Sequence, residues 1–129
     1  MKLFNHVQIK VKNLGRSRKF YGPVMAALGY NMVLEIEGIV IGYGTSVHDM
    51  FEIRQFDEKS LLSEHVHLAF NASCKEDVDV FYKSALASGG KCNGEPRFRP
   101  QYEDGYYAAF VIDPDGHNIE AVYSEKSIT

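Results

Sequence analysis

The chain has 129 residues, of which 45% are hydrophobic and 24% charged, which is the composition of an ordinary globular domain. Its formal charge of −3 is spread without a basic cluster, so neither nucleic acid nor an anionic membrane is an expected partner. The longest apolar run, YYAAFVI, is too short to span a membrane, and the first residues do not resemble a signal peptide. Cys74 and Cys92 form no disulfide framework or metal motif. We expect a soluble, cytoplasmic protein.

The first half of the chain predicts a strand, a helix and three further strands. Residues 3–11 alternate between apolar side chains and the polar residues His6, Gln8 and Lys10, which is the period of a strand. A helix is predicted over about 15–28, where apolar residues recur four apart. The short runs YNMVLEIE, IVIGYG and MFEIRQ then predict three strands.

The second half predicts the same order of elements. HVHLAF alternates like a strand, and Ser73 with Glu76 has the spacing of a capping box that opens a helix over 75–88. KCNGEP gives a weak strand signal. YYAAFVI and NIEAVY predict two further strands, joined by the turn DPDG.

The two halves are copies of one unit. Laying HVQIKVKNLGRSRKFYGPVMAALG over HLAFNASCKEDVDVFYKSALASGG without a gap places His6 on His67, the pair FY on FY, and Gly29 on Gly90. The sequence therefore predicts one α+β domain, 1–129, made of two βαβββ modules over about 1–56 and 65–124, with the helices on the outside.

Each copy also carries a carboxylate on its last strand. Glu52 stands between apolar neighbours in FEI, and Glu120 in IEA, so both point to the polar face that carries His6 and His67. A charged residue in a strand is costly to bury unless it is paired or bound to a metal. Two imidazoles and two carboxylates suit a divalent ion with open coordination positions.

The chain resembles the vicinal oxygen chelate superfamily, which includes glyoxalase I, bleomycin-resistance and extradiol dioxygenase proteins. The resemblance rests on the strand histidine followed by FY and on the ending DPDGHNIE, and it covers nearly the whole chain. It implies that the two modules pair into a cup-shaped mixed sheet, in a homodimer, with His6, Glu52, His67 and Glu120 as metal ligands. The second half is most similar to small glyoxalase-like bacterial proteins. Many of these have an aromatic residue at the position of Glu52, so the resemblance supports this ligand least.

A site of this kind implies a divalent nickel, zinc, manganese or iron ion and a small oxygenated substrate. The metal would stabilise an oxyanion, while Glu120, or alternatively Glu52, moves a proton as the catalytic base. This chemistry is that of a metal-dependent lyase or isomerase. Two alternatives stay open: a metal-free protein that binds a drug or metabolite, and an extradiol-type dioxygenase with a two-histidine, one-carboxylate iron site.

Further residues are candidates for substrate contact. His65 lies two positions before His67 and would share its sheet face, unless it sits at an exposed rim. The segment 94–107 has an irregular pattern with two prolines, which predicts a loop that folds over the cup or packs on the surface. Its arginines suit an anionic group and its tyrosines offer stacking surfaces: Arg97, Arg99, Tyr102, Tyr106 and Tyr107. His48 and His117 lie in or beside turns, where we expect solvated side chains and no role.

Overall fold

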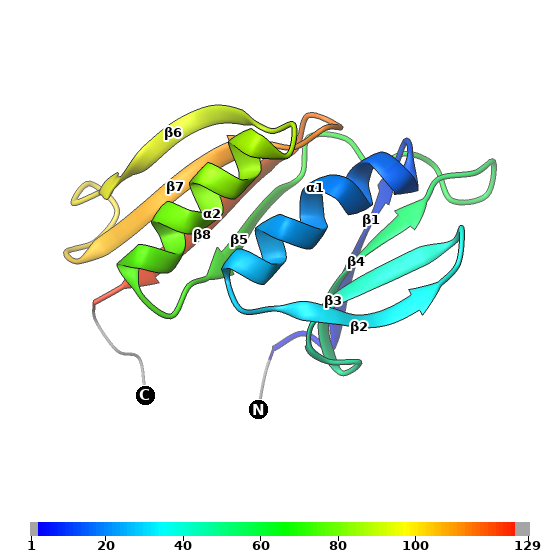
Figure 1. The fold of residues 1–129 in the computed structure, drawn as a ribbon, viewed down its shortest axis with the longest axis horizontal. Helices are drawn as coiled ribbons and strands as arrows, with labels where there is room; N and C mark the ends of the chain where they lie inside the picture. Colours follow the sequence, from blue (N-terminus) through cyan, green and yellow to red (C-terminus); the bar gives the residue numbers. More distant parts are fainter. Residues whose placement is uncertain (1–2, 126–129) are drawn as a thin grey trace.

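The computed structural model describes residues 3–125 as two βαβββ modules, each a four-stranded mixed sheet with one helix (Figure 1). The predicted α+β class and the module order are confirmed. The first module comprises β1 (His6–Val11), α1 (Leu14–Ala27), β2 (Asn31–Ile36), β3 (Val40–Ser46) and β4 (Asp49–Gln55). The second comprises β5 (His67–Asn71), α2 (Lys75–Ala87), β6 (Lys91–Phe98), β7 (Tyr106–Ile112) and β8 (Asn118–Ser124).

The two sheets have the same strand order and the same register. The orders are β1-β4-β3-β2 and β5-β8-β7-β6, and in each the first and last strands of the module pair in parallel. Glu52 pairs with Gln8, and Glu120 pairs with Ala69. Each glutamate thus lies opposite the residue two positions after its histidine, so the sequence repeat holds residue by residue on these strands.

The helix bounds match the prediction to within one residue at each end. The Asn13 side chain accepts a hydrogen bond from the Arg16 amide and caps the start of α1. Gly29 and Gly89 follow the helices with φ of 87° and 100°, which only glycine adopts without strain. The predicted capping box is wrong, because the N-cap of α2 is Cys74 and Ser73 lies outside the helix. Neither described helix is long and apolar enough to cross a membrane.

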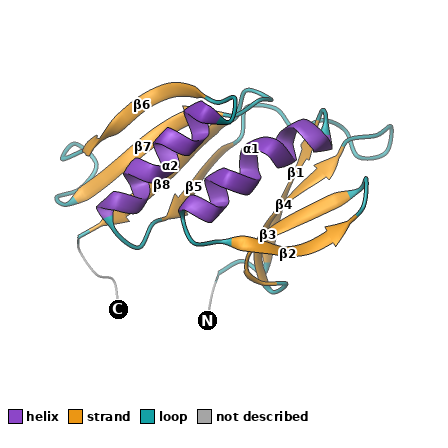
Figure 2. Ribbon diagram, viewed as in Figure 1, coloured by secondary structure: helices purple, strands orange, loops and turns teal. Residues whose placement is uncertain are grey.

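A single core of aromatic and aliphatic side chains joins the modules. The helices α1 and α2 lie next to each other on the same side of the molecule, and each covers one face of its sheet (Figure 2). Phe20 and Phe81, equivalent in the repeat, are completely buried. Phe51 of β4 contacts Phe70 of β5 edge to face, with ring centroids 5.2 Å apart. The sheet faces away from the helices, here called the open faces, carry Glu52 and Glu120.

The connection between β7 and β8, Asp113–His117, links the second module to α1 by side-chain hydrogen bonds. Asp113 is buried and accepts a hydrogen bond from the Tyr21 hydroxyl, while Arg16 donates to Asp115 at 2.7 Å. His117 is completely buried, and its Nδ1 accepts from the Val66 amide at 3.0 Å. The expectation of a solvated His117 is therefore wrong: its side chain is packed between the modules, although Gly116 of the same turn is exposed.

The expected irregular loop over 94–107 is also corrected. Residues up to Phe98 continue β6, with Arg97 opposite Ala108 of β7, and a short connection then leads to Tyr106. The strand is recognisable only with difficulty because it carries a proline, Pro96, and two shifts of register. An edge strand tolerates both features, since one of its sides has no ladder to maintain. The segment is thus the edge of the second sheet.

Replacing Tyr21 with Phe should lower the free energy of unfolding by about 1–3 kcal/mol, because the buried Asp113 loses a donor. Burial and the adjacent Asp113 raise the pKa of Tyr21 above its usual 10.0. A raised pKa stabilises the fold below pH 10 and this contribution is lost as the pH rises further. Urea unfolding at neutral and alkaline pH should therefore show the deficit of Tyr21→Phe shrinking above pH 10; a constant deficit would contradict this account.

Candidate functional site

The open face of the second sheet holds a buried carboxylate with two side-chain donors. Glu120 lies in the middle of β8 with 3% of its surface exposed. Its Oε1 is 2.9 Å from Nε2 of His67, at the start of β5, and its Oε2 accepts a hydrogen bond from the Tyr106 hydroxyl of β7. The His67 side chain is 54% exposed. Solvent and ligands can thus reach the imidazole, while the carboxylate stays beneath it.

Tyr106 is held as a proton donor. Burial, with the hydrogen bond to Glu120 and the charge of that carboxylate, raises the pKa of Tyr106 well above its usual value. The phenol therefore keeps its proton at neutral pH and fixes one carboxylate oxygen. Tyr102 packs edge to face on Tyr106, with ring centroids 5.5 Å apart, and extends this surface towards solvent.

Arg99 forms the wall beside this cluster. It is 5% exposed, donates to the backbone carbonyls of Glu95 and Ala108, and lies over the Phe110 ring at 5.1 Å. Burial, with the charge of Arg97, lowers the pKa of Arg99. The Phe110 ring lies 6.2 Å from that of His67. The N–H groups of the guanidinium therefore bind backbone carbonyls of the same chain. Arg99 supports the site in this way and is not an accessible anion-binding group.

The first sheet carries the equivalent glutamate with a different partner. Glu52 is buried, and Gln8 Nε2 donates to its Oε1 at 2.9 Å. His6 is exposed, and its Nδ1 lies 2.8 Å from Oδ1 of Asn5. The difference follows from one position of the repeat, because Gln8 corresponds to Ala69. Alanine cannot reach a carboxylate, so in the second sheet the histidine contacts it instead.

The four predicted ligands do not meet within one chain. Within residues 3–125, no cluster of three or more histidine, cysteine, aspartate or glutamate side chains could hold a metal ion. His67 and Glu120 are in contact, whereas His6 and Glu52 share a face of the other sheet without contacting each other. A single chain therefore presents one His/Glu pair on each of two open faces.

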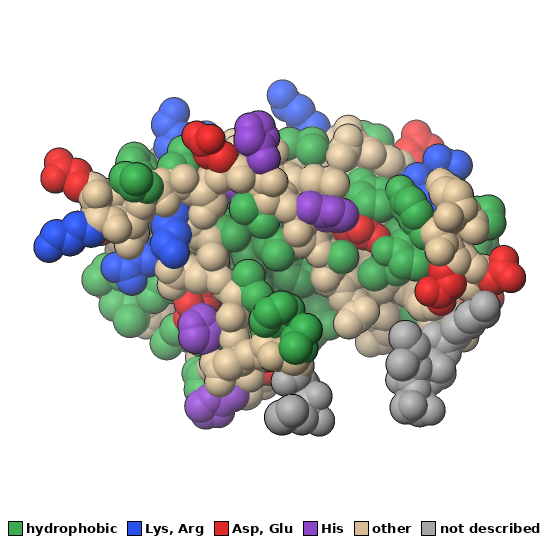
Figure 3. All heavy atoms as spheres, turned by 180° about the vertical axis from the view of Figure 1, so that it is seen from behind, with side chains coloured by type: hydrophobic (Ala, Val, Ile, Leu, Met, Phe, Trp, Pro, Cys, Tyr) green, Lys and Arg blue, Asp and Glu red, His purple; other side chains and the backbone are tan. Residues whose placement is uncertain are grey.

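Figure 3 shows the side of the molecule opposite to Figure 1. Hydrophobic side chains gather in a hollow near its middle, and histidine side chains lie around it on more than one side. The surface that bears the histidines is therefore partly apolar. Such a surface suits either an organic ligand or a second protein chain.

His65 and Tyr107 lie elsewhere than the sequence suggested. The strand β5 begins at His67, and His65 precedes it with an exposed side chain and φ of 53°. Of the two expectations for His65, the exposed rim position therefore holds and the shared sheet face does not. Tyr107 points to the helix-covered side, where its hydroxyl donates to Asp79 of α2 at 2.7 Å. That hydrogen bond, with burial, raises the pKa of Tyr107 to about 12. Tyr107 therefore contributes to packing and not to the open face.

Arg97 and Tyr102 are accessible, since both are exposed near the end of the second sheet.

Sequence reasoning did not predict three contacts of the site residues. Gln8 and Tyr106 donate to the two glutamates, and Phe110 lies beside His67. Gln8 could have been found, because it stands two positions after His6 on the polar side of the strand. The other two depend on the register of β7 against β8, where Phe110 pairs with Glu120. The sequence pattern alone does not give that register.

A family model, the Glyoxalase/Bleomycin resistance protein/Dioxygenase superfamily, matches residues 3–121. The chain belongs to this superfamily. It is 30% identical over 126 residues to the uncharacterized protein YqjT of Bacillus subtilis (strain 168), covering 92% of this chain and 96% of that protein. The resemblance drawn from the sequence motifs is confirmed.

Solved structures of the superfamily share the fold over nearly the whole chain. A glyoxalase/bleomycin resistance protein from Albidiferax ferrireducens T118 is 30% identical with a TM-score of 0.79, covering 94% of this chain and 98% of that one. Lactoylglutathione lyase from Agrobacterium tumefaciens is 19% identical with a TM-score of 0.67, covering 95% and 93%. The second likeness shows the fold alone.

Replacing Arg99 with Met should lower the free energy of unfolding by about 1–3 kcal/mol, because two backbone carbonyls lose their charged donor. The matched control is Arg97→Met, which removes an exposed arginine and should change stability by no more than about 0.5 kcal/mol. Urea unfolding measures both. Equal stability of the two variants would show that Arg99 does not support the sheet.

Proposed function

We propose that the protein is a divalent-metal-dependent lyase or isomerase that acts on a small molecule with neighbouring oxygen atoms. The observation that carries this proposal is the contact between His67 and the buried Glu120, 2.9 Å apart, on an accessible sheet face. This imidazole and carboxylate, in contact with each other, are half of the ligand set that the superfamily resemblance implies.

The residues fit a metal by their chemistry. A histidine nitrogen and a carboxylate oxygen bind nickel, zinc, manganese and iron, and a second pair would complete four ligands with open positions for substrate. Tyr106 donates to the other oxygen of Glu120, which is how carboxylate ligands are commonly oriented. On this proposal the metal is held by His67 and Glu120 together with His6 and Glu52.

The second pair comes from another copy of the chain. Since His6 and Glu52 lie on a different sheet from His67 and Glu120, a centre with all four requires the open face of the first module to meet that of the second. In a homodimer with two-fold symmetry, this meeting occurs twice and makes two equal sites. The protein is accordingly proposed to act as a homodimer.

The bound metal would supply a Lewis acid for two adjacent substrate oxygens. Glu120 is then the group that moves a proton: it takes one from a substrate carbon and returns it to the neighbouring atom, which completes an isomerisation without any other reactant. Tyr106 occupies the Oε2 oxygen, so Oε1, the oxygen beside His67, would bind the metal at rest and would receive the proton only after leaving the ion. Phe110 beside His67 and Tyr102 beside Tyr106 provide apolar surface next to the site.

A second candidate, a metal-free binding protein, is favoured by a different observation. Both oxygens of Glu120 already have protein partners, as does one oxygen of Glu52. The carboxylates are therefore stable in the sheets without any ion, and the open faces could hold an organic ligand directly.

The dioxygenase alternative would use iron bound by His6, His67 and Glu120, while Glu52 keeps its hydrogen bond from Gln8.

Calorimetric titration with nickel, zinc and manganese tests the proposal. His67→Ala, Glu120→Ala and His6→Ala should each weaken binding by more than the roughly 10–100-fold that losing an outer partner costs. Tyr106→Phe should fall within that range, and Glu52→Ala should be milder than the first three because water can replace its oxygen. The control is Glu58→Ala, which removes an exposed carboxylate between β4 and β5 and should bind like the wild type.

The titration also separates the candidates. Wild-type protein that takes up none of the three metals would overturn the lyase or isomerase proposal and support the binding protein. Metal uptake that survives Glu120→Ala would show that the ion sits elsewhere. Loss of binding in Glu52→Ala as severe as in His67→Ala would make Glu52 a full ligand.

A further inference from the structure

The open face of the first sheet carries two cationic side chains next to each other, here called the cation pair. Lys10 of β1 and Arg54 of β4 are partners in the parallel register, two positions after Gln8 and Glu52. Because side chains alternate along a strand and Gln8 contacts Glu52, the pair two positions later points to the same face. Arg54 thus follows Glu52 on this face, about 7 Å further along the strand.

Neither member of the cation pair has a carboxylate within ion-pair distance in the described part of the chain. The Nε atom of Arg54 is shielded from solvent and has no hydrogen-bond partner there. Glu52 accepts from Gln8, and the exposed Asp57 accepts from two backbone amides. The charge of Arg54 also lowers the pKa of Asp57, but less than those hydrogen bonds do. Adjacent like charges and a buried donor without a partner are both unfavourable, and a bound anion would relieve both.

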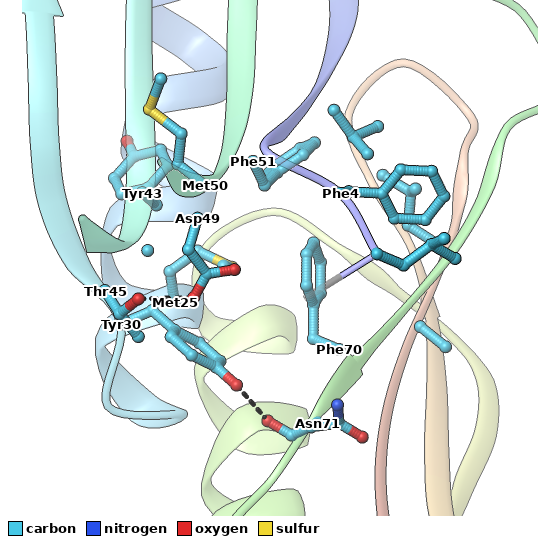
Figure 4. A pocket seen from close by; sticks show the side chains of 15 residues that line it. Phe4, Met25, Tyr30, Tyr43, Thr45, Asp49, Met50, Phe51, Phe70 and Asn71 are labelled. Carbon is cyan, nitrogen blue, oxygen red and sulfur yellow. Dashed lines mark hydrogen bonds between the residues drawn. The ribbon is translucent and has the colours of Figure 1, made fainter. Parts of the chain in front are cut away.

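The cation pair belongs to one end of one sheet. Its members are the only lysine or arginine residues in the described strands of the first sheet, and the equivalent positions of the second sheet are Asn71 and Val122. At the other end of β1, beside Val7, a pocket of about 560 Å³ lies between the modules (Figure 4). None of its fifteen described lining residues is a lysine or arginine. An anionic group on the first sheet therefore finds its cationic partners at the cation pair.

The chemistry of the cation pair fits a carboxylate. The guanidinium of Arg54 has a planar fork of N–H donors that matches two carboxylate oxygens, and the ammonium of Lys10 adds a further charged donor. Since the pair shares a sheet face with His6 and Glu52, an anion held there would lie beside the proposed metal centre. We infer that the substrate of this centre carries a carboxylate, bound by Lys10 and Arg54, several bonds away from its neighbouring oxygens. This inference rests on the proposed function.

Two hydroxamates that differ in one charge test the inference. A hydroxamate binds a metal through two neighbouring oxygens, and the monohydroxamate of glutaric acid adds a distant carboxylate that its methyl ester lacks. In calorimetric titration of protein loaded with the metal that it takes up, the acid should bind at least about tenfold more tightly than the ester. Lys10→Met and Arg54→Met should each remove most of this advantage, while the ester and the metal bind as they do to the wild type.

A matched control and a stability measurement make the result specific. Lys19→Met removes an exposed lysine of α1, with the same change of charge on the helix side, and should bind both hydroxamates like the wild type. In urea, neither cation-pair variant should unfold at a lower midpoint than the wild type, because neither side chain has a partner to lose. A lower midpoint would give the cations a structural role. Equal affinity of the wild type for acid and ester, or an equal effect of all three variants, would overturn the inference.

A titration without metal separates this inference from the proposed function. Glutarate should shift the backbone amide NMR signals of Lys10 and Arg54, the neutral diamide should not, and Arg54→Met should abolish the shift. If the protein takes up no metal, the proposed function fails and this titration alone decides; absence of the shift then overturns the inference as well. Dissociation of a wild-type dimer by Lys10→Met or Arg54→Met would also overturn it, because the cations would then bind the partner chain.

Discussion

A carboxylate in the middle of a sheet is the constraint on which the candidate site depends. Glu120 is flanked in β8 by Ile119 and Ala121, both completely buried, so its own position is fixed by the packing of the core behind it. A buried ionised group must be supplied with donors or a cation. His67 and Tyr106 supply the donors here, and each comes from a neighbouring strand. The site is thus built into the sheet and held as rigidly as the sheet itself.

The two modules show how a repeat can keep its geometry and change its chemistry. Glu52 and Glu120 occupy equal register, but Gln8 contacts the first, while Ala69 leaves the second to His67. Opposite the glutamates on the next strands stand Gly42 and Phe110. The loops differ as well, since only the second module carries the connection Asp113–His117. Small differences of this kind give the second sheet a His/Glu contact where the first has a Gln/Glu contact.

The order of elements, the repeat and the polar faces followed from local pattern alone, because alternation and helix stop signals depend on neighbours in sequence. What the pattern did not give depends on tertiary context. Pro96 left only a weak signal for the edge strand β6, and His65 takes a left-handed conformation just before the strand that its alternation was expected to extend. His117 has the sequence context of a solvated turn, yet it is buried because the turn packs between modules. In the proposed dimer, His6 and Glu52 join the other pair between chains, and no pattern within one chain records such an arrangement.

The most direct test of the proposed metal centre is to mix two variants that each lack half of the proposed ligands. One variant carries His6→Ala with Glu52→Ala, the other His67→Ala with Glu120→Ala, and each alone should hold no metal. If the centre forms between chains, the exchanged mixture should regain about a quarter of the wild-type metal content, because half of randomly assorted dimers are mixed and each has one complete site. A mixture with no more metal than the separate variants, alongside a fully loaded wild type, would contradict the account.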